Sequence, residues 1–285
     1  MSYRRVTLKS TTPGNRVIKQ HSFRSDNNIP CLPSEVADQL IDDPTLLLER
    51  LNAIFGTNHS FYSRGHWREI MEYCIDRGYD LGLAYGMLRS RWSYIPETSI
   101  VPKLEALESK DSERRDCAVI NGLVHNRMIP PRRVWDLYSN RVLPFWAIHA
   151  PDWNEQSSGR SDQIQAVSHA WMCPEKREGV QTRINGGKWP VPIPRGISLD
   201  DLRIELLNFS KGQPTAWAGH AEYVWLDALC LRQAGGAQEE EVLRAKEWEI
   251  DVPTIGSIYR RCESIVIYLD GLGRPFEEND LNSKR

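Results

Sequence analysis

The sequence predicts an α/β fold in which a doubly wound, mainly parallel sheet follows a helical region. Two observations predict it. From Ile164 to Gly271 the sequence alternates strand, helix, strand, helix and strand patterns, which is typical of right-handed crossovers that cover both faces of a parallel sheet. From Cys31 to Ile129 apolar residues instead recur at spacings of three and four, which indicates amphipathic helices.

The composition indicates a globular protein of the cytoplasm. The chain has 285 residues, of which 40% are hydrophobic, and a formal net charge of -2, which suits one large or two ordinary domains. No run approaches about 18 apolar residues and no secretory signal is evident, so we expect no membrane span. The near-neutral charge gives no support for binding to nucleic acid.

Cysteine and histidine spacing indicates no metal site. The six cysteines lie far apart without a C-x-x-C pair, so we expect buried thiols rather than disulfides or a zinc cluster. They are Cys31, Cys74, Cys117, Cys173, Cys230 and Cys262. His59 and His66 are seven apart, a spacing typical of one helix face, but two histidines without a third ligand indicate a structural role.

The amino-terminal segment has a composition of its own. Residues 1–24 carry six basic residues, no acidic residue and six serines or threonines. We expect a disordered basic tail over residues 1–30, because so little apolar surface cannot offset the entropy of ordering. The alternative is an organelle transit peptide, since such peptides are rich in Arg and Ser and poor in acidic residues. A short polar tail is expected at residues 277–285.

Residues 31–129 are predicted to form a helical accessory region with no motif that indicates its purpose. Ser34 can cap a first helix, Pro44 suits the first turn of a second, and Gly56 ends that second helix. Two or three further helices are expected before the region ends.

Residues 130–276 are predicted to form the α/β region. Prolines around two short β-prone runs, at 134–138 and 142–146, mark its start. Three mostly parallel strands of one sheet are then expected at 164–169, 222–227 and 264–269, with 222–227 next to at least one of the others. The connecting helices are expected at 198–212, capped by Ser198, and at 239–262, kinked or divided by Pro253.

Asp227 interrupts an apolar block, Tyr223–Leu226, that reads as a strand buried on both faces. In open parallel sheets, ligands bind beyond the carboxyl ends of the strands. Ser168 and His169 end one expected strand and Asp227 ends the next, so their side chains could converge on one crevice. The alternative is that Asp227 binds no ligand and only accepts hydrogen bonds from nearby backbone or from Ser168.

Three sequence segments of the α/β region together form a recognisable pattern. The second of these segments is the most specific. The three segments are SHAW at 168–171, VWLDALCLRQ at 224–233 and PTIGSIYRRCESIVIYL at 253–269. Together they resemble the successive signatures of the fungal heterokaryon-incompatibility (HET) domain, over roughly residues 131–276. The second signature, W-[IL]-D-x-[LI]-C-[IL]-x-Q, is matched in register, whereas the first has His169 for the usual Tyr and Met172 for the usual Gly. The crevice residues implied are Ser168, His169, Trp171, Trp225, Asp227, Cys230 and Gln233.

The resemblance implies a cytoplasmic role in fungal self/non-self recognition, with growth arrest or cell death as the output. It also implies a doubly wound, flavodoxin-like sheet similar to that of Toll/interleukin-1 receptor (TIR) domains, some of which cleave NAD with a glutamate. NAD is therefore the implied substrate, and no resident cofactor is implied. Glu247 and Glu249, which flank Trp248, are the candidate catalytic carboxylates. The W-T-x-Q-E segment that the family carries downstream is not in this sequence, so we expect NAD cleavage to be absent or slight.

Two other interpretations compete with catalysis on NAD. The α/β region could be a protein-interaction module that binds a partner protein or a like domain, including a second copy of the chain. A thiol enzyme would use Cys230 with His169, provided that the two lie within hydrogen-bond reach and the pKa of the thiol is lowered.

Overall fold

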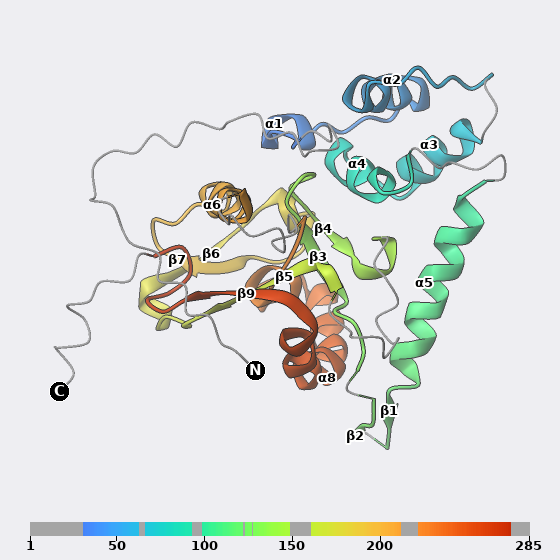
Figure 1. The fold of residues 1–285 in the computed structure, drawn as a ribbon. Coiled ribbons are helices and arrows are strands. Elements are labelled where there is room, and N and C mark those ends of the chain that lie inside the picture. Colours follow the sequence, from blue (N-terminus) through green and yellow to red (C-terminus); the bar gives the residue numbers. More distant parts are fainter. Residues whose placement is uncertain are drawn as a thin grey trace, which may run out of the picture.

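The computed structural model of the chain describes residues 31–62, 66–92, 99–121, 123–126, 128–148, 161–211 and 222–274. The tails expected at residues 1–30 and 277–285 lie outside these ranges. Within them, helices accompany a mixed β-sheet, so the fold is α/β (Figure 1). No helix of the described part is both long enough and apolar enough to cross a membrane.

The part of the chain before the sheet is helical, as expected. Its helices are α1 (Ser34–Ala37), α2 (Pro44–Phe55), α3 (Trp67–Asp76), α4 (Leu81–Arg89) and α5 (Val101–Asp116). A short hairpin of β1 (Val119–Ile120) and β2 (Leu123–Val124) follows them. Figure 1 shows α5 leading away from the other helices toward this hairpin.

The capping residues of this region were predicted in part. α2 begins at Pro44 and ends before Gly56, whose φ of 67° is the left-handed conformation that glycine adopts without strain. Asp43 completes the start of α2 by accepting hydrogen bonds from the backbone N–H groups of Thr45 and Leu46. The prediction for Ser34 was wrong, because it is the first residue inside α1 and its hydroxyl donates to Asp200 Oδ1 at 2.9 Å instead.

The two histidines of the helical region have structural surroundings. His59 lies after α2, where its ring stacks on Trp67 with centroids 4.1 Å apart and burial lowers the pKa of the imidazole. His66 directly precedes α3, and its Nδ1 lies 3.2 Å from Glu69 Oε2. Among the described residues, no group of three or more His, Cys, Asp or Glu side chains could hold a metal ion.

The central sheet has five strands in the order β4-β3-β8-β5-β9. These are β3 (Arg133–Asp136), β4 (Arg141–Pro144), β5 (Ser161–His169), β8 (Tyr223–Leu226) and β9 (Cys262–Tyr268). β8, β5 and β9 are parallel, which confirms that the three predicted strands share one sheet with 222–227 beside another of them. β3 and β4, the two β-prone runs after the prolines, add antiparallel strands at one side and make the sheet mixed.

Two helices connect the parallel strands and lie on opposite sides of the sheet in Figure 1. α6 (Leu199–Lys211) begins after Ser198, whose Oγ accepts from the backbone N–H groups of Asp200 and Asp201, as predicted. α8 (Gln238–Arg261) is one continuous helix with Pro253 inside it, so of the two alternatives, a kink or a division, the division is excluded. Side chains on both sides of the proline, Asp251 and Ile258 among them, are buried.

The strand that holds Asp227 is shorter than its sequence pattern predicts. β8 ends at Leu226, and Asp227 is the first residue of a short helix, α7 (Asp227–Cys230). A second small sheet, the antiparallel pair β6 (Arg177–Val180) and β7 (Val191–Pro194), lies between β5 and α6 and was not predicted. Short 3₁₀ helices occupy Phe145–Ala147, Pro174–Lys176 and Arg183–Asn185.

One hydrophobic core joins the helical region to the sheet and extends from Leu32 to Leu272. α4 packs closely on α1 and on the turn between β3 and β4: a Cβ built on Gly82 would lie 2.8 Å from the Ala37 side chain and 3.0 Å from the Ser139 carbonyl oxygen, so only glycine allows this packing. Beside it, Arg89 of α4 donates hydrogen bonds to Asp136 at 2.8 Å and to Glu222 at 2.6 Å. The helices therefore complete the core of the sheet.

Candidate functional site

Asp227 lies where β8 ends and accepts three hydrogen bonds. Its Oδ1 accepts from the backbone N–H of Ala228 at 2.6 Å and from Nε2 of His169 at 2.8 Å. Its Oδ2 accepts from Nε1 of Trp171 at 3.0 Å. Ser168 was the side chain expected to donate to Asp227. The structure instead gives His169 and Trp171 as the side-chain donors. The carboxylate is therefore satisfied by the end of the adjacent strand, β5.

His169 and Trp171 are positioned by the pairing of β5 with β8. In this parallel pair Val167 is aligned with Leu226, so β8 ends beside the last residues of β5, which continue to pair with β9 as far as His169. The side chain of His169 is only 4% exposed, whereas Trp171 is 46% exposed. The two rings lie 5.0 Å apart, and the guanidinium of Arg177 lies 5.2 Å from the Trp171 ring. We name His169, Trp171 and Asp227 the Asp227 cluster.

Gln233 and Cys230 support the backbone around α7 instead of lining a crevice. The Gln233 Nε2 donates to the carbonyl oxygens of Asp227 at 3.0 Å and Leu231 at 3.1 Å, and so closes the turn. The Cys230 thiol is buried and donates to the Val224 carbonyl at 3.7 Å, and burial raises its pKa to about 12. A thiol with a raised pKa is a poor nucleophile, and His169 is bonded to Asp227, so the geometry gives no support to a thiol enzyme.

Trp225 and Ser168 contact Tyr259 of α8. The buried ring of Trp225 meets the ring of Tyr259 edge to face, with centroids 5.4 Å apart. The Tyr259 hydroxyl donates to the Val167 carbonyl at 3.1 Å. Burial raises the pKa of Tyr259 to about 12, although its hydrogen bond with Ser168 lowers it. The charge of Asp227 also raises the pKa of Tyr259, so this tyrosine lies within electrostatic reach of the Asp227 cluster.

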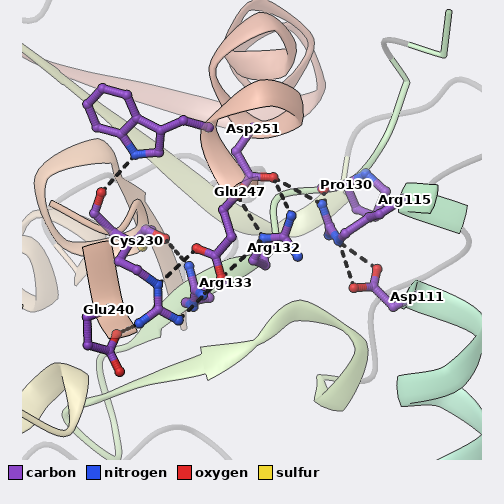
Figure 2. A network of polar contacts seen from close by, with 11 residues as sticks. Asp111, Arg115, Pro130, Arg132, Arg133, Cys230, Glu240, Glu247 and Asp251 are labelled. Carbon is purple, nitrogen blue, oxygen red and sulfur yellow. Dashed lines mark hydrogen bonds and ion pairs between the residues drawn. The ribbon is translucent and has the colours of Figure 1, made fainter. Parts of the chain in front are cut away.

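Glu247 is a buried carboxylate of α8 surrounded by arginines (Figure 2). Its Oε1 accepts a short hydrogen bond from Arg133 Nη2, and its two oxygens lie 3.3 Å from the Nη2 and Nε of Arg232. Arg132 Nε lies 3.9 Å from Oε1. Burial alone would raise the pKa of Glu247, but the arginines outweigh it and lower the pKa to about 2. The carboxylate is therefore ionised and paired.

The arginines around Glu247 belong to a larger network that links distant segments. Asp251, one turn after Glu247, accepts from Arg132 at 2.8 and 3.1 Å and from Arg115 of α5 at 3.4 Å. Arg115 also binds Asp111 at 2.8 Å and the Pro130 carbonyl at 3.2 Å. Arg232 forms a further ion pair with Glu240. We name this set the arginine network: Asp111, Arg115, Arg132, Arg133, Arg232, Glu240, Glu247 and Asp251.

An aromatic side chain that the sequence pattern did not single out packs against the arginine network. Trp189 is almost fully buried, with the guanidinium of Arg133 at 5.2 Å from its ring and that of Arg232 at 4.9 Å. Such cation–π contacts are strengthened by burial. The sequence contains one sign of the network: the spacing of Glu247 and Asp251 puts both acids on one helix face. This spacing does not reveal which residues pair with them.

The structure separates the two glutamates that were candidates for catalysis. Glu249 is exposed on α8, whereas Glu247 is enclosed by arginines. Chemically, Glu247 is suited to holding positive side chains in place. A general acid would need a higher pKa, near the working pH.

No protein-family profile matches this chain, and no curated protein or solved structure matches it either.

Proposed function

We propose that the chain is a HET-like protein of fungal self/non-self recognition whose α/β region acts in the cytoplasm by binding a protein partner. One observation carries the proposal: the three segments that bear the resemblance contact one another. His169 and Trp171 of the first segment bind Asp227 of the second. Tyr259 of the third packs on Trp225 of the second. Residues that recur together in a signature are expected to support one local structure.

The proposal includes a doubly wound, TIR-like arrangement of the parallel strands. It is supported by the position of β5, the first parallel strand, between β8 and β9. The chain therefore adds its second and third parallel strands on opposite sides of the first. In flavodoxin-like folds this reversal of direction defines the switch point at which ligands bind.

Partner binding is favoured over NAD cleavage by the state of the carboxylates. Cleavage of the nicotinamide bond passes through a cationic sugar, which needs a carboxylate placed beside it. Asp227 already accepts three hydrogen bonds, and Glu247 is paired with arginines. Engaging either with a substrate would first require breaking these contacts. We therefore propose a binding role in which the Asp227 cluster supports the surface around Trp171.

Inducible expression in a filamentous fungus tests this function. We expect the wild-type chain to arrest hyphal growth or kill cells, and Asp227→Ala to lose the effect at matched protein level, because the support of His169 and Trp171 is removed. Asp42→Ala, a change of an exposed aspartate in the helical region, is the matched control and should retain it. Normal growth with abundant wild-type protein would refute the proposal.

A further inference from the structure

β9 is the last strand at one edge of the central sheet, and no other strand of the described residues pairs with its outer side. Its side chains alternate in burial. Val266 and Tyr268 are buried, whereas Ile265, Ile267 and Leu269, on the other face, are 42%, 57% and 50% exposed. The strand thus combines an unpaired edge with a stripe of exposed apolar side chains, the two features that favour pairing with another strand.

The opposite edge of the same sheet is protected by different means. β4 carries Arg141, whose buried guanidinium donates to Asp80 and to Asp38, and Pro144, which lacks an N–H group. α4 also packs directly on this strand, since a Cβ on Gly86 would lie 3.0 Å from Leu143. β9 carries one charged residue, Glu263, near its start, and no charged residue, proline or glycine from Ser264 to Leu269. Natural sheets usually place such residues on edges that must stay single.

We propose that the β9 edge is an interface between two copies of this chain, with the two β9 strands antiparallel about a two-fold axis. The inference rests on the proposed binding function and names its partner. When Ile267 lies opposite the same residue of the second copy, Ile265 lies opposite Leu269, and all six exposed apolar side chains meet on one face.

The other face of the same register is compatible with pairing. Val266 lies opposite Tyr268, and Ser264 lies opposite Asp270, whose carboxylate can accept a hydrogen bond from the serine hydroxyl. No two like charges face each other between Ser264 and Asp270. One strand pair with three exposed apolar residues from each copy is small beside the roughly 1,000 Å² that a stable interface buries, so the dimer should be weak and concentration-dependent.

Analytical ultracentrifugation of the purified full chain over a concentration series tests the interface. We expect reversible dimerisation, and Ile267→Lys should weaken it by at least about tenfold, because two ammonium groups would then face each other. Leu40→Lys, which changes an exposed leucine of the helical region, is the matched control and should dimerise like the wild type. Circular dichroism establishes that both variants are folded.

A cross-linking variant tests the register even if Ile267→Lys does not fold. Directly opposite residues of antiparallel strands have Cβ atoms about 5 Å apart, so Ile267→Cys should form a disulfide-linked dimer under mild oxidation. Leu40→Cys places an exposed cysteine in the helical region and so measures non-specific cross-linking, to which the exposed native Cys117 and Cys173 also contribute. A chain that stays monomeric at every concentration, or equal cross-linking by both cysteine variants, would overturn the interface. A monomer that still arrests hyphal growth would overturn only this inference, and a dimer without growth arrest would overturn only the proposed function.

Discussion

The Asp227 cluster and the arginine network both hold a carboxylate of the α/β region, but they do so with different partners. Asp227 accepts from a backbone amide, an imidazole and an indole, and the two side chains come from the end of β5 and the loop directly after it. Glu247 is paired with guanidinium groups from two separate segments of the chain. The first cluster includes the half-exposed Trp171, whereas Glu247 and Asp251 of the second are buried.

This difference indicates that the stability of the fold depends more on Glu247 than on Asp227. Removing one member of a buried ion network leaves uncompensated charges, which costs more than removing an acceptor of neutral donors. The arginine network also joins α5, the start of β3 and α8, so its loss would loosen several elements together. The network is therefore expected to serve stability, and the Asp227 cluster to serve the local surface.

The largest expected effect is that of Glu247→Ala. The change leaves Arg133 and Arg232 without their buried counter-charge and should lower the free energy of unfolding by about 3–5 kcal/mol. Urea unfolding followed by circular dichroism measures it. Glu249→Ala, two residues along the same helix on an exposed position, is the control and should change the free energy by less than about 0.5 kcal/mol. Equal effects of the two changes would contradict the structural role of the network.

The stability of the fold should also depend on pH through the ionisation of Glu247. The pKa of Glu247 is about 2 in the folded chain against an ordinary value of 4.5. A lowered pKa stabilises the fold fully above the ordinary value and loses this contribution as the pH falls toward 2, a total of about 3 kcal/mol. The difference in unfolding free energy between the wild type and Glu247→Gln should therefore shrink as the pH is lowered from about 5 to about 2. A difference that stays constant over this range would refute the assignment.

A smaller effect is expected for Asp227→Ala. The backbone amide of Ala228 and the ring N–H groups of His169 and Trp171 would lose their acceptor, at a cost of about 1–3 kcal/mol. Thermal unfolding compares this variant with the exposed control Asp42→Ala, which should melt like the wild type. If Asp227→Ala kept full stability and lost only partner binding, the carboxylate would contact the partner itself.

The smallest effect is expected on NAD. Purified wild-type protein should release little or no nicotinamide, because a missing positioned carboxylate costs several powers of ten in rate. The double variant Glu247→Gln, Glu249→Gln should behave in the same way, with nicotinamide followed by chromatography. Strong release of nicotinamide by the wild type that the double variant abolishes would instead identify a catalytic carboxylate on α8. Glu247 or Glu249 would then serve catalysis.

The sequence by itself determined the local elements of the protein. Periodicity and capping residues located α2, with Pro44 and Gly56 at its ends, and α6, with Ser198 before it. Apolar runs located the parallel strands, and the order of polar residues after them predicted that His169 and Asp227 would lie near each other. These features depend on residues a few positions apart, or on strands that end at one edge of a sheet, so local patterns contain the information.

Only the tertiary structure decided which partners the charged residues have and where the sheet ends. Arg115 and Asp251 are 136 positions apart, and no periodicity links them. The same holds for the antiparallel placement of β3 against β8 and for the exposed edge at β9. α7 starts at Asp227, directly after the strand, and the hydrogen bond of this residue with His169 of β5 joins positions 58 apart in the sequence. The physical reason is that such pairings are selected by burial and charge compensation in the assembled core, where residues distant in sequence meet.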